Sequence, residues 1–264
     1  MRKQGNPSNS TRRDLDGPWR PGFADPRPSR VALSISTAQS HAPAQISPNY
    51  RGDLSNPRNQ IANIPESENC STWWVGLPAN CTYGMLFDSM RNVGAVSHAF
   101  ICPPGKVHTT SAAKVEFFER ASVDRLLDQQ QQGHLRVGGR EPYIKLNRIK
   151  VAPHSNESCD EQGNKEQSSR VLQVTGDERI VNREHLKAVL DDPNNRLSYG
   201  LESAEAFALP DGLGCVEFRF ASYVVQALRV RHLFMSQERR GDISEEERSL
   251  WEGITISFGP DPCE

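Results

Sequence analysis

Alternating apolar and polar residues predict four strands in the first half of the chain, at residues 72–78, 95–102, 110–118 and 143–151. The adjacent Trp73 and Trp74, flanked by Thr and Val, favour the first strand. Leu86, Met90 and Val93 recur at helical spacing and predict a helix that Thr82 caps, and residues 122–132 form a second helix. The predicted order is β-α-β-β-α-β.

The second half repeats this order. Strands are predicted at residues 170–176, 199–209, 214–220 and 254–258, with helices at 182–191 and 222–235. Residues 237–251 are charged and predict a solvated loop or short helix, with Trp251 packed onto the domain. We therefore expect an α+β protein with two ferredoxin-like domains, at residues 69–152 and 170–264, joined by a linker at 153–169.

Residues 1–68 are rich in Pro, Ser, Asn, Gln and Arg and have no sustained apolar period, which predicts a disordered N-terminal segment. The segment is locally basic, as in a flexible arm that contacts phosphate or a nuclear targeting segment. We favour a solvated tail, because Arg12 and Arg13 are its only adjacent arginines and no basic run occurs.

The first half carries a longer pattern, W-W-V-G-L-P…T…L-F…M…V-G…V…K-V-E-F-F…A-S-V…R-I-K-V, which resembles the RNA recognition motif. The segments Asn69-Cys70-Ser71, Val137-Gly138-Gly139, Asn147-Arg148-Ile149 and the stretch from Phe258 to Cys263 resemble uncharacterised proteins of filamentous fungi that carry such motifs. The resemblance covers residues 69–151 well and 170–262 weakly. It implies RNA lying on a four-stranded sheet, with aromatic side chains on the central strands stacking its bases.

Side chains alternate along a strand, so only one face of this sheet can meet RNA. An ungapped alignment with the family places Trp73 outward and Trp74 inward, and a shift of one residue would reverse them. A small bulge near Ser97 and His98 would direct Phe100 outward. The outward candidates for RNA binding are aromatic and basic: Trp73, Phe100, Lys114, Tyr143, Lys145, Arg148 and Lys150.

The third strand departs from the family. Ala112 and Lys114 stand where the resemblance implies aromatic residues, and base stacking is worth about 1–3 kcal/mol per base. We therefore expect weak binding of single-stranded RNA. On a competing interpretation, Phe100 and Tyr143 only cover the edge of the sheet, and the lysines keep the surface of the sheet soluble. In the second domain Gln173, Cys215 and Glu217 occupy the corresponding positions, so its sheet is not expected to bind RNA.

The alternative function is a protein–protein interaction scaffold whose domains have lost RNA binding. The net charge of −2 favours this alternative, because nucleic-acid binding commonly shows a strongly basic footprint. The outward aromatics and the basic fourth strand favour RNA.

No motif indicates catalysis, since the chain lacks His-Glu-x-x-His, Gly-x-Ser-x-Gly and a phosphate loop. We expect a non-enzymatic protein without cofactors. The six cysteines contain no Cys-x-x-Cys pair, so no metal site is expected. No apolar run reaches transmembrane length and no signal-peptide pattern is present, so we expect an intracellular protein, nuclear or cytoplasmic, without membrane contact.

Overall fold

The computed structural model describes residues 64–159 and 165–264. The predicted N-terminal segment therefore lies outside the described residues, except for residues 64–68, which include the short 3₁₀ turn Glu66–Glu68.

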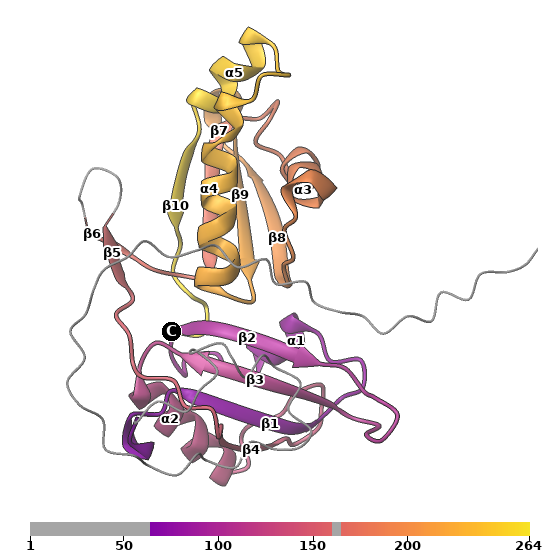
Figure 1. Ribbon diagram of the computed structural model, residues 1–264, viewed down its shortest axis with the longest axis vertical. Coiled ribbons are helices and arrows are strands. Elements are labelled where there is room, and N and C mark those ends of the chain that lie inside the picture. The colour runs from indigo at the N-terminus through magenta and orange to yellow at the C-terminus, as the bar shows by residue number, and fades with distance from the viewer. Residues whose placement is uncertain (1–63, 160–164) are drawn as a thin grey trace, which may run out of the picture. The chain divides into compact units, whose positions relative to one another are not determined.

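The first sheet contains four strands, each antiparallel to its neighbours, in the order β2-β3-β1-β4 (Figure 1). Its elements follow one another as β1 (Ser71–Leu77), α1 (Tyr83–Asp88), β2 (Val96–Cys102), β3 (Ser111–Phe117), α2 (Arg120–Gln131) and β4 (Tyr143–Leu146). This is the predicted β-α-β-β-α-β order, with the first and third strands in the centre.

Local interactions explain where these elements begin and which face they bury. The Thr82 side chain accepts a hydrogen bond from the backbone N–H of Met85 (3.2 Å) and starts α1 as a cap. Trp74 is fully buried and packs in one core with residues of α1 and α2. Its indole N–H donates to the Thr72 hydroxyl (3.0 Å), so its burial leaves no donor unpaired.

The second sheet has the same strand order. Its elements are β7 (Val171–Asp177), α3 (Arg183–Asp191), β8 (Leu201–Ala208), β9 (Leu213–Phe220), α4 (Leu228–Met235), α5 (Glu245–Glu252) and β10 (Thr255–Phe258). The strands lie in the order β10-β7-β9-β8, so β7, β8, β9 and β10 correspond to β1, β2, β3 and β4. The prediction of an α+β fold with two ferredoxin-like domains is confirmed.

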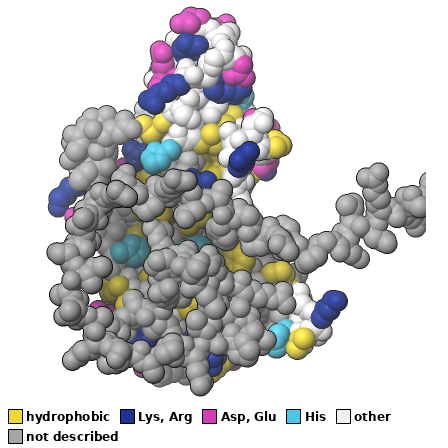
Figure 2. All heavy atoms as spheres, viewed as in Figure 1, with side chains coloured by type: hydrophobic (Ala, Val, Ile, Leu, Met, Phe, Trp, Pro, Cys, Tyr) yellow, Lys and Arg dark blue, Asp and Glu magenta, His cyan; other side chains and the backbone are white. Residues whose placement is uncertain are grey.

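Short helical segments complete the second half. A π-helix, Tyr223–Ala227, precedes α4, and 3₁₀ turns occur at Pro193–Asn195, Pro210–Gly212 and Gln237–Arg239. Charges of both signs mix around α5 (Figure 2), as expected for a solvated segment. Trp251 is 3% exposed and stacks near Phe234, which confirms the prediction that it packs onto the domain.

The fourth strand is shorter than predicted, because it ends at Leu146 instead of continuing to Val151. Beyond Leu146, hydrogen bonds from the buried side chain of Asn69 hold the chain in place of regular strand pairing. Its Oδ1 accepts from the backbone N–H groups of Ser71 (3.0 Å) and Val151 (3.2 Å), and its Nδ2 donates to the carbonyl of Asn147 (2.9 Å). An amide side chain can therefore bond the chain after β4 to the start of β1 without a regular strand.

Two further segments carry local pairing. The expected linker contains the two-stranded pair β5 (Glu157–Cys159) and β6 (Lys165–Gln167). Before β4, Val137 pairs with Arg140 across the glycine turn.

The guanidinium of Arg170, just before β7, joins elements of both sheets within one compact unit. It is fully buried and makes a two-pronged ion pair with Asp261 (3.0 and 2.8 Å), and its third nitrogen contacts Glu202 (2.5 Å). It also lies 3.7 Å from the ring centroid of Phe87 in α1. Burial opposes its charge, but the facing carboxylate of Asp261 raises the pKa of Arg170 above its ordinary value.

The two carboxylates extend the network into the first sheet. Asp261 also accepts the backbone N–H of Val96 at the start of β2 (2.8 Å). Glu202 also contacts Arg91 after α1 (2.7 Å). The β8 register shifts between Leu201 and Ser203, so Glu202 lies in a bulge, a distortion that can redirect a side chain.

We predict that Arg170→Met strongly destabilises the protein. Removing Arg170 leaves Asp261 as a buried carboxylate without its cation and leaves Glu202 with Arg91 alone. Breaking a buried ion pair in this way costs about 3–5 kcal/mol in comparable cases. Urea unfolding followed by circular dichroism measures the loss. Arg179→Met is the matched control, because Arg179 pairs with Asp177 and Glu246 on an exposed surface. Equal unfolding midpoints for the two variants would contradict this role of Arg170.

Candidate nucleic-acid interface

Four side chains form a straight row across the first sheet, on the face opposite α1 and α2. Phe100 of β2 lies opposite Lys114 of β3, Lys114 lies opposite Trp73 of β1, and Trp73 lies opposite Lys145 of β4. Directly opposed residues share a face and have Cβ atoms about 4.5–5.5 Å apart. The row therefore alternates aromatic, cationic, aromatic and cationic groups.

The pleat of β1 separates its two tryptophans. Trp74 is fully buried under the helices, whereas Trp73 is partly exposed on the other face. The register of β2 shifts between Val96 and His98, as the predicted bulge requires, and Phe100 is 45% exposed beside β3. The faces predicted for Trp73, Trp74 and Phe100 therefore agree with the structure.

A carboxylate restrains the central lysine of the row. Lys114 Nζ lies 2.5 Å from Glu116 Oε1, and the two side chains are 28% and 14% exposed. His98 lies opposite Glu116, and burial lowers its pKa although Glu116 acts against the shift. The neutral form of His98 is thus favoured, and Lys145 is the exposed cation of the row.

Tyr143 lies one row away, opposite Val75, and is 61% exposed. On the other side of this second row, Cys102 of β2 pairs with Ala112 of β3. The only large ring that these pairings place in the second row is thus on the edge strand β4, and the centre lacks the stacking surface that the family resemblance implies.

Arg148 and Lys150 do not join the row. The sequence placed them on the outward face of a long fourth strand, which is wrong because β4 ends at Leu146. Arg148 is exposed beyond the strand. The ammonium of Lys150 donates to the carbonyl of Ile64 (2.9 Å). The structure thus brings together Trp73, Phe100, Lys114 and Lys145, with Tyr143 beside them.

Glu116 is the residue of this face that sequence reasoning passed over. The signal is the Lys-Val-Glu order, because residues two apart on a strand share a face and can form an ion pair.

The corresponding row of the second sheet is acidic. Glu205, Glu217, Gln173 and Ser257 lie opposite one another across β8, β9, β7 and β10. Gln173 donates to Glu217 (2.9 Å), and Arg219 pairs with the same carboxylate (2.7 Å). The same fold therefore presents aromatic and basic groups on one sheet and carboxylates on the other.

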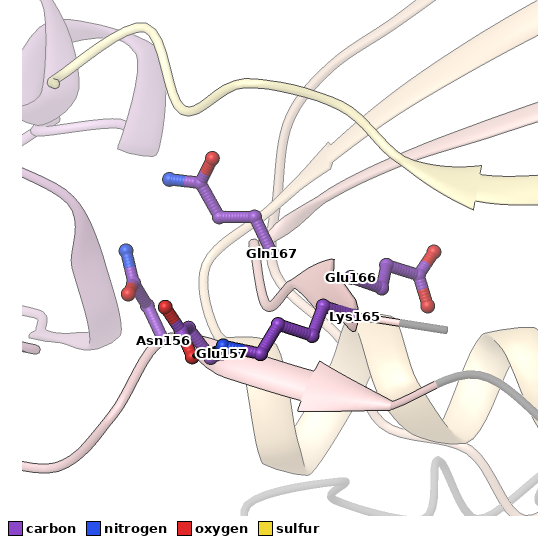
Figure 3. Close-up of a pocket in the computed structure, with 5 residues that line it drawn as sticks. All are labelled: Asn156, Glu157, Lys165, Glu166 and Gln167. Carbon is purple, nitrogen blue, oxygen red and sulfur yellow. Dashed lines mark hydrogen bonds and ion pairs between the residues drawn. The ribbon is translucent and has the colours of Figure 1, made fainter. Parts of the chain in front are cut away.

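The remaining candidate sites carry little chemistry. A hollow beside β5 and β6 is lined by Asn156, Glu157, Lys165, Glu166 and Gln167 (Figure 3). Lys165 and Glu157 pair there at 3.3 Å with both side chains well exposed, and Glu166 is held in an ion pair with Arg231. The described residues contain no cluster of three metal-ligating side chains. In the same parts of the chain, no helix combines the length and apolar character needed to cross a bilayer.

Comparisons with known proteins add little. No protein-family model matches the chain, and no curated protein matches it. Solved structures of RNA-binding proteins are similar over most of its length. The first two RRM domains of the yeast poly(U)-binding protein Pub1 are 15% identical, covering 72% of this chain and 99% of that one, with a TM-score of 0.26.

Two structures solved with RNA match in the same way. A Sex-lethal protein–RNA complex is 13% identical over 72% of this chain and 99% of that one (TM-score 0.26). The RNA-binding domain of Hrp1 with RNA is 17% identical over 73% and 97% (TM-score 0.25). At such TM-scores these similarities carry no conclusion about this chain. Its fold follows from its own strand order, and the resemblance to fungal proteins stays a prediction.

We predict that Cys70 and Cys263 react slowly with Ellman's reagent in the native protein. Burial raises the pKa of Cys70 to about 11 and that of Cys263 to about 12. At pH 8 at most about one thiol in a thousand is then the reactive thiolate. Labelling resolved by mass spectrometry, before and after unfolding in urea, measures the difference. Fast native labelling of Cys263 would show that its site is open.

Proposed function

We propose that the protein binds single-stranded RNA weakly, through the face of the first sheet that carries Trp73, and that it catalyses no reaction. The observation that carries this proposal is the cross-strand row of Phe100, Lys114, Trp73 and Lys145. Single-strand binders combine rings that stack bases with cations that follow the backbone, and this row supplies both.

The spacing of the row suits successive nucleotides. Trp73 and Phe100 are separated by one strand, so their backbones lie about 10 Å apart. Lys114 stands between the two rings and Lys145 stands beyond Trp73. Two bases stacked on the rings would leave their linking phosphate near Lys114, with Lys145 next to the neighbouring one.

The same geometry limits affinity. Glu116 already satisfies Lys114, so a phosphate must compete with a close, partly buried carboxylate. Ala112 adds no stacking surface. With Lys145 as the available cation of the row, RNA binding neutralises about one to two phosphates. The slope of log K against log salt is then expected to be about −0.7 for each phosphate of a single strand.

We do not propose the second sheet as an RNA site. Its corresponding row contains Glu205 and Glu217, and Gln173 replaces the central tryptophan. Carboxylates at the middle of a sheet repel phosphate, so RNA binding is assigned to the first sheet alone.

We predict that Trp73→Ala weakens binding of a labelled, mixed-sequence single-stranded RNA by about 5- to 150-fold, which corresponds to the loss of one stacked base. Fluorescence anisotropy with the full chain measures the dissociation constant. Trp73→Phe retains a ring and should retain most of the binding. Phe207→Ala removes an exposed ring from the second sheet and should leave RNA binding unchanged.

Two results would overturn the proposal. One is the absence of saturable binding at low salt up to about 100 μM, the weak end of ordinary non-specific binding. The other is a loss of RNA affinity that is equal in Trp73→Ala and Phe207→Ala.

We predict that Glu116→Gln strengthens RNA binding, because it releases Lys114 from its ion pair. One additional phosphate contact makes the slope of log K against log salt steeper by about 0.7. Glu217→Gln is the matched control: it makes the same charge change on the central strand β9 of the second sheet, where Glu217 is also ion-paired. A slope that changes equally in both variants would indicate net charge rather than the row.

A further inference from the structure

One strand edge of the second sheet is open. β8 is the outer strand of the order β10-β7-β9-β8, and the side chains from Glu205 to Ala208 are all exposed. No other strand of the described residues pairs with this half of β8. A free edge presents backbone donors and acceptors that can pair with another chain.

The register shows which backbone groups are free. The N–H of Leu209 donates to the carbonyl of Leu213 (2.8 Å), so this pair is hydrogen-bonded across the turn. Hydrogen-bonded pairs recur every second residue, which assigns Phe207 and Glu205 to bonds with β9. Ala206 and Ala208 therefore direct their N–H and C=O groups away from β9.

The corresponding edge of the first sheet is covered. In β2, the N–H of Ala99 donates to the carbonyl of Ala221 (2.7 Å), and His98 forms a bridge with Ser222. The chain thus closes one edge with its own backbone and leaves the other unpaired within the described residues.

The open edge lacks the usual protection. Natural edges are blocked by lysine, proline, bulges or covering elements. The bulge of β8 lies at its beginning, between Leu201 and Ser203, and Pro210 follows its end. Between these points Glu205 is the single charged side chain, and Ala206 and Ala208 offer no steric barrier.

The side chains beside the edge define the partner. Glu205 is exposed and has no ion pair within the described residues, whereas Glu217 beside it is paired with Arg219. Phe207, Leu209 and Leu213 are 48%, 38% and 40% exposed. An added strand therefore meets a carboxylate and, two residues further on the same face, an aromatic ring.

We propose that residues 205–208 of β8 bind an extended segment of a protein partner as an additional strand, with a basic residue beside Glu205 and an apolar residue beside Phe207. Backbone hydrogen bonds supply the affinity, and the alternating side chains supply the selectivity. Pairing of Ala206 with Ala206 of a second copy is disfavoured, because the two Glu205 side chains would then share one face within diagonal reach. RNA is disfavoured by the same carboxylate.

The test uses the full chain and a fluorescein-labelled peptide, Thr-Lys-Thr-Ile-Thr-Thr, together with its reversed sequence. Binding is measured by anisotropy, and amide hydrogen exchange at Ala206 and Ala208 reports the site. We expect saturable binding that slows exchange at both amides. Replacing the peptide lysine by glutamate should weaken binding about fivefold or more, as expected for an opposite-charge pair replaced by a like-charge one.

Two changes separate backbone pairing from simple charge attraction. Ala206→Pro removes an outward N–H without touching the bonds to β9, and should abolish binding while the unfolding midpoint stays close to that of the parent. Ala206→Val retains the N–H and should bind normally. Two peptides N-methylated at alternate residues, one at the odd and one at the even positions, provide a further test. The peptide whose methyl groups point toward β8 should not bind, because it lacks the N–H groups that would pair with the edge.

Three outcomes overturn the proposal. They are no saturable binding up to about 1 mM peptide, the threshold of weak association; equal binding by Ala206→Pro; and a dimer in sedimentation that Ala206→Pro converts to monomer. The last result assigns the edge to a second copy.

Discussion

The buried ion pair between Arg170 and Asp261 connects the segment after β10 to the starts of β7 and β2, and the packing of the other elements depends on it. Taking these charges out of water is costly, and the cost is offset because both side chains make several further hydrogen bonds and contacts. Asp261 accepts from Arg170 and from the backbone of Val96, and Arg170 also reaches Glu202 and the ring of Phe87. The start of β2 is thus fixed by a residue beyond β10. Since β2 carries Phe100, one end of the proposed RNA row depends on this pair.

The two sheets show that one fold can carry opposite surfaces. Their strands have the same order, and their rows correspond position by position. Trp73 in one sheet corresponds to Gln173 in the other, and Lys114 corresponds to Glu217. Strand order therefore says little about ligand preference, which lies in the outward side chains. Our proposals accordingly place RNA on the first surface and a protein segment at the edge of the second.

The elements and their faces could be predicted because their causes are local. Adjacent tryptophans must point to opposite faces, and the helix caps Thr82, Asn182 and Ser222 are short-range signals. The bulge near Ser97 followed from the apolar residues on either side of it.

The failures come from long-range partners. The end of β4 depends on Asn69, which lies 82 positions before Val151. An arginine at the start of a strand gives no hint that its two carboxylates lie 32 and 91 positions further along the chain. The close pairing of Lys114 with Glu116 was local, but charged neighbours on a strand are usually interpreted as solvated groups.

The placement of Asp261 and Cys263 also constrains the order of folding. Both are buried, and Cys263 belongs to the core of the first sheet although it follows the last strand of the second. The hydrogen-bond acceptor of the Val96 N–H, Asp261, lies 165 positions further along the chain. During synthesis, all four strands of the first sheet are therefore made long before Asp261 and Cys263, which complete its packing, are available. Its final consolidation is a late, non-local step, which is the kind of contact that slows folding.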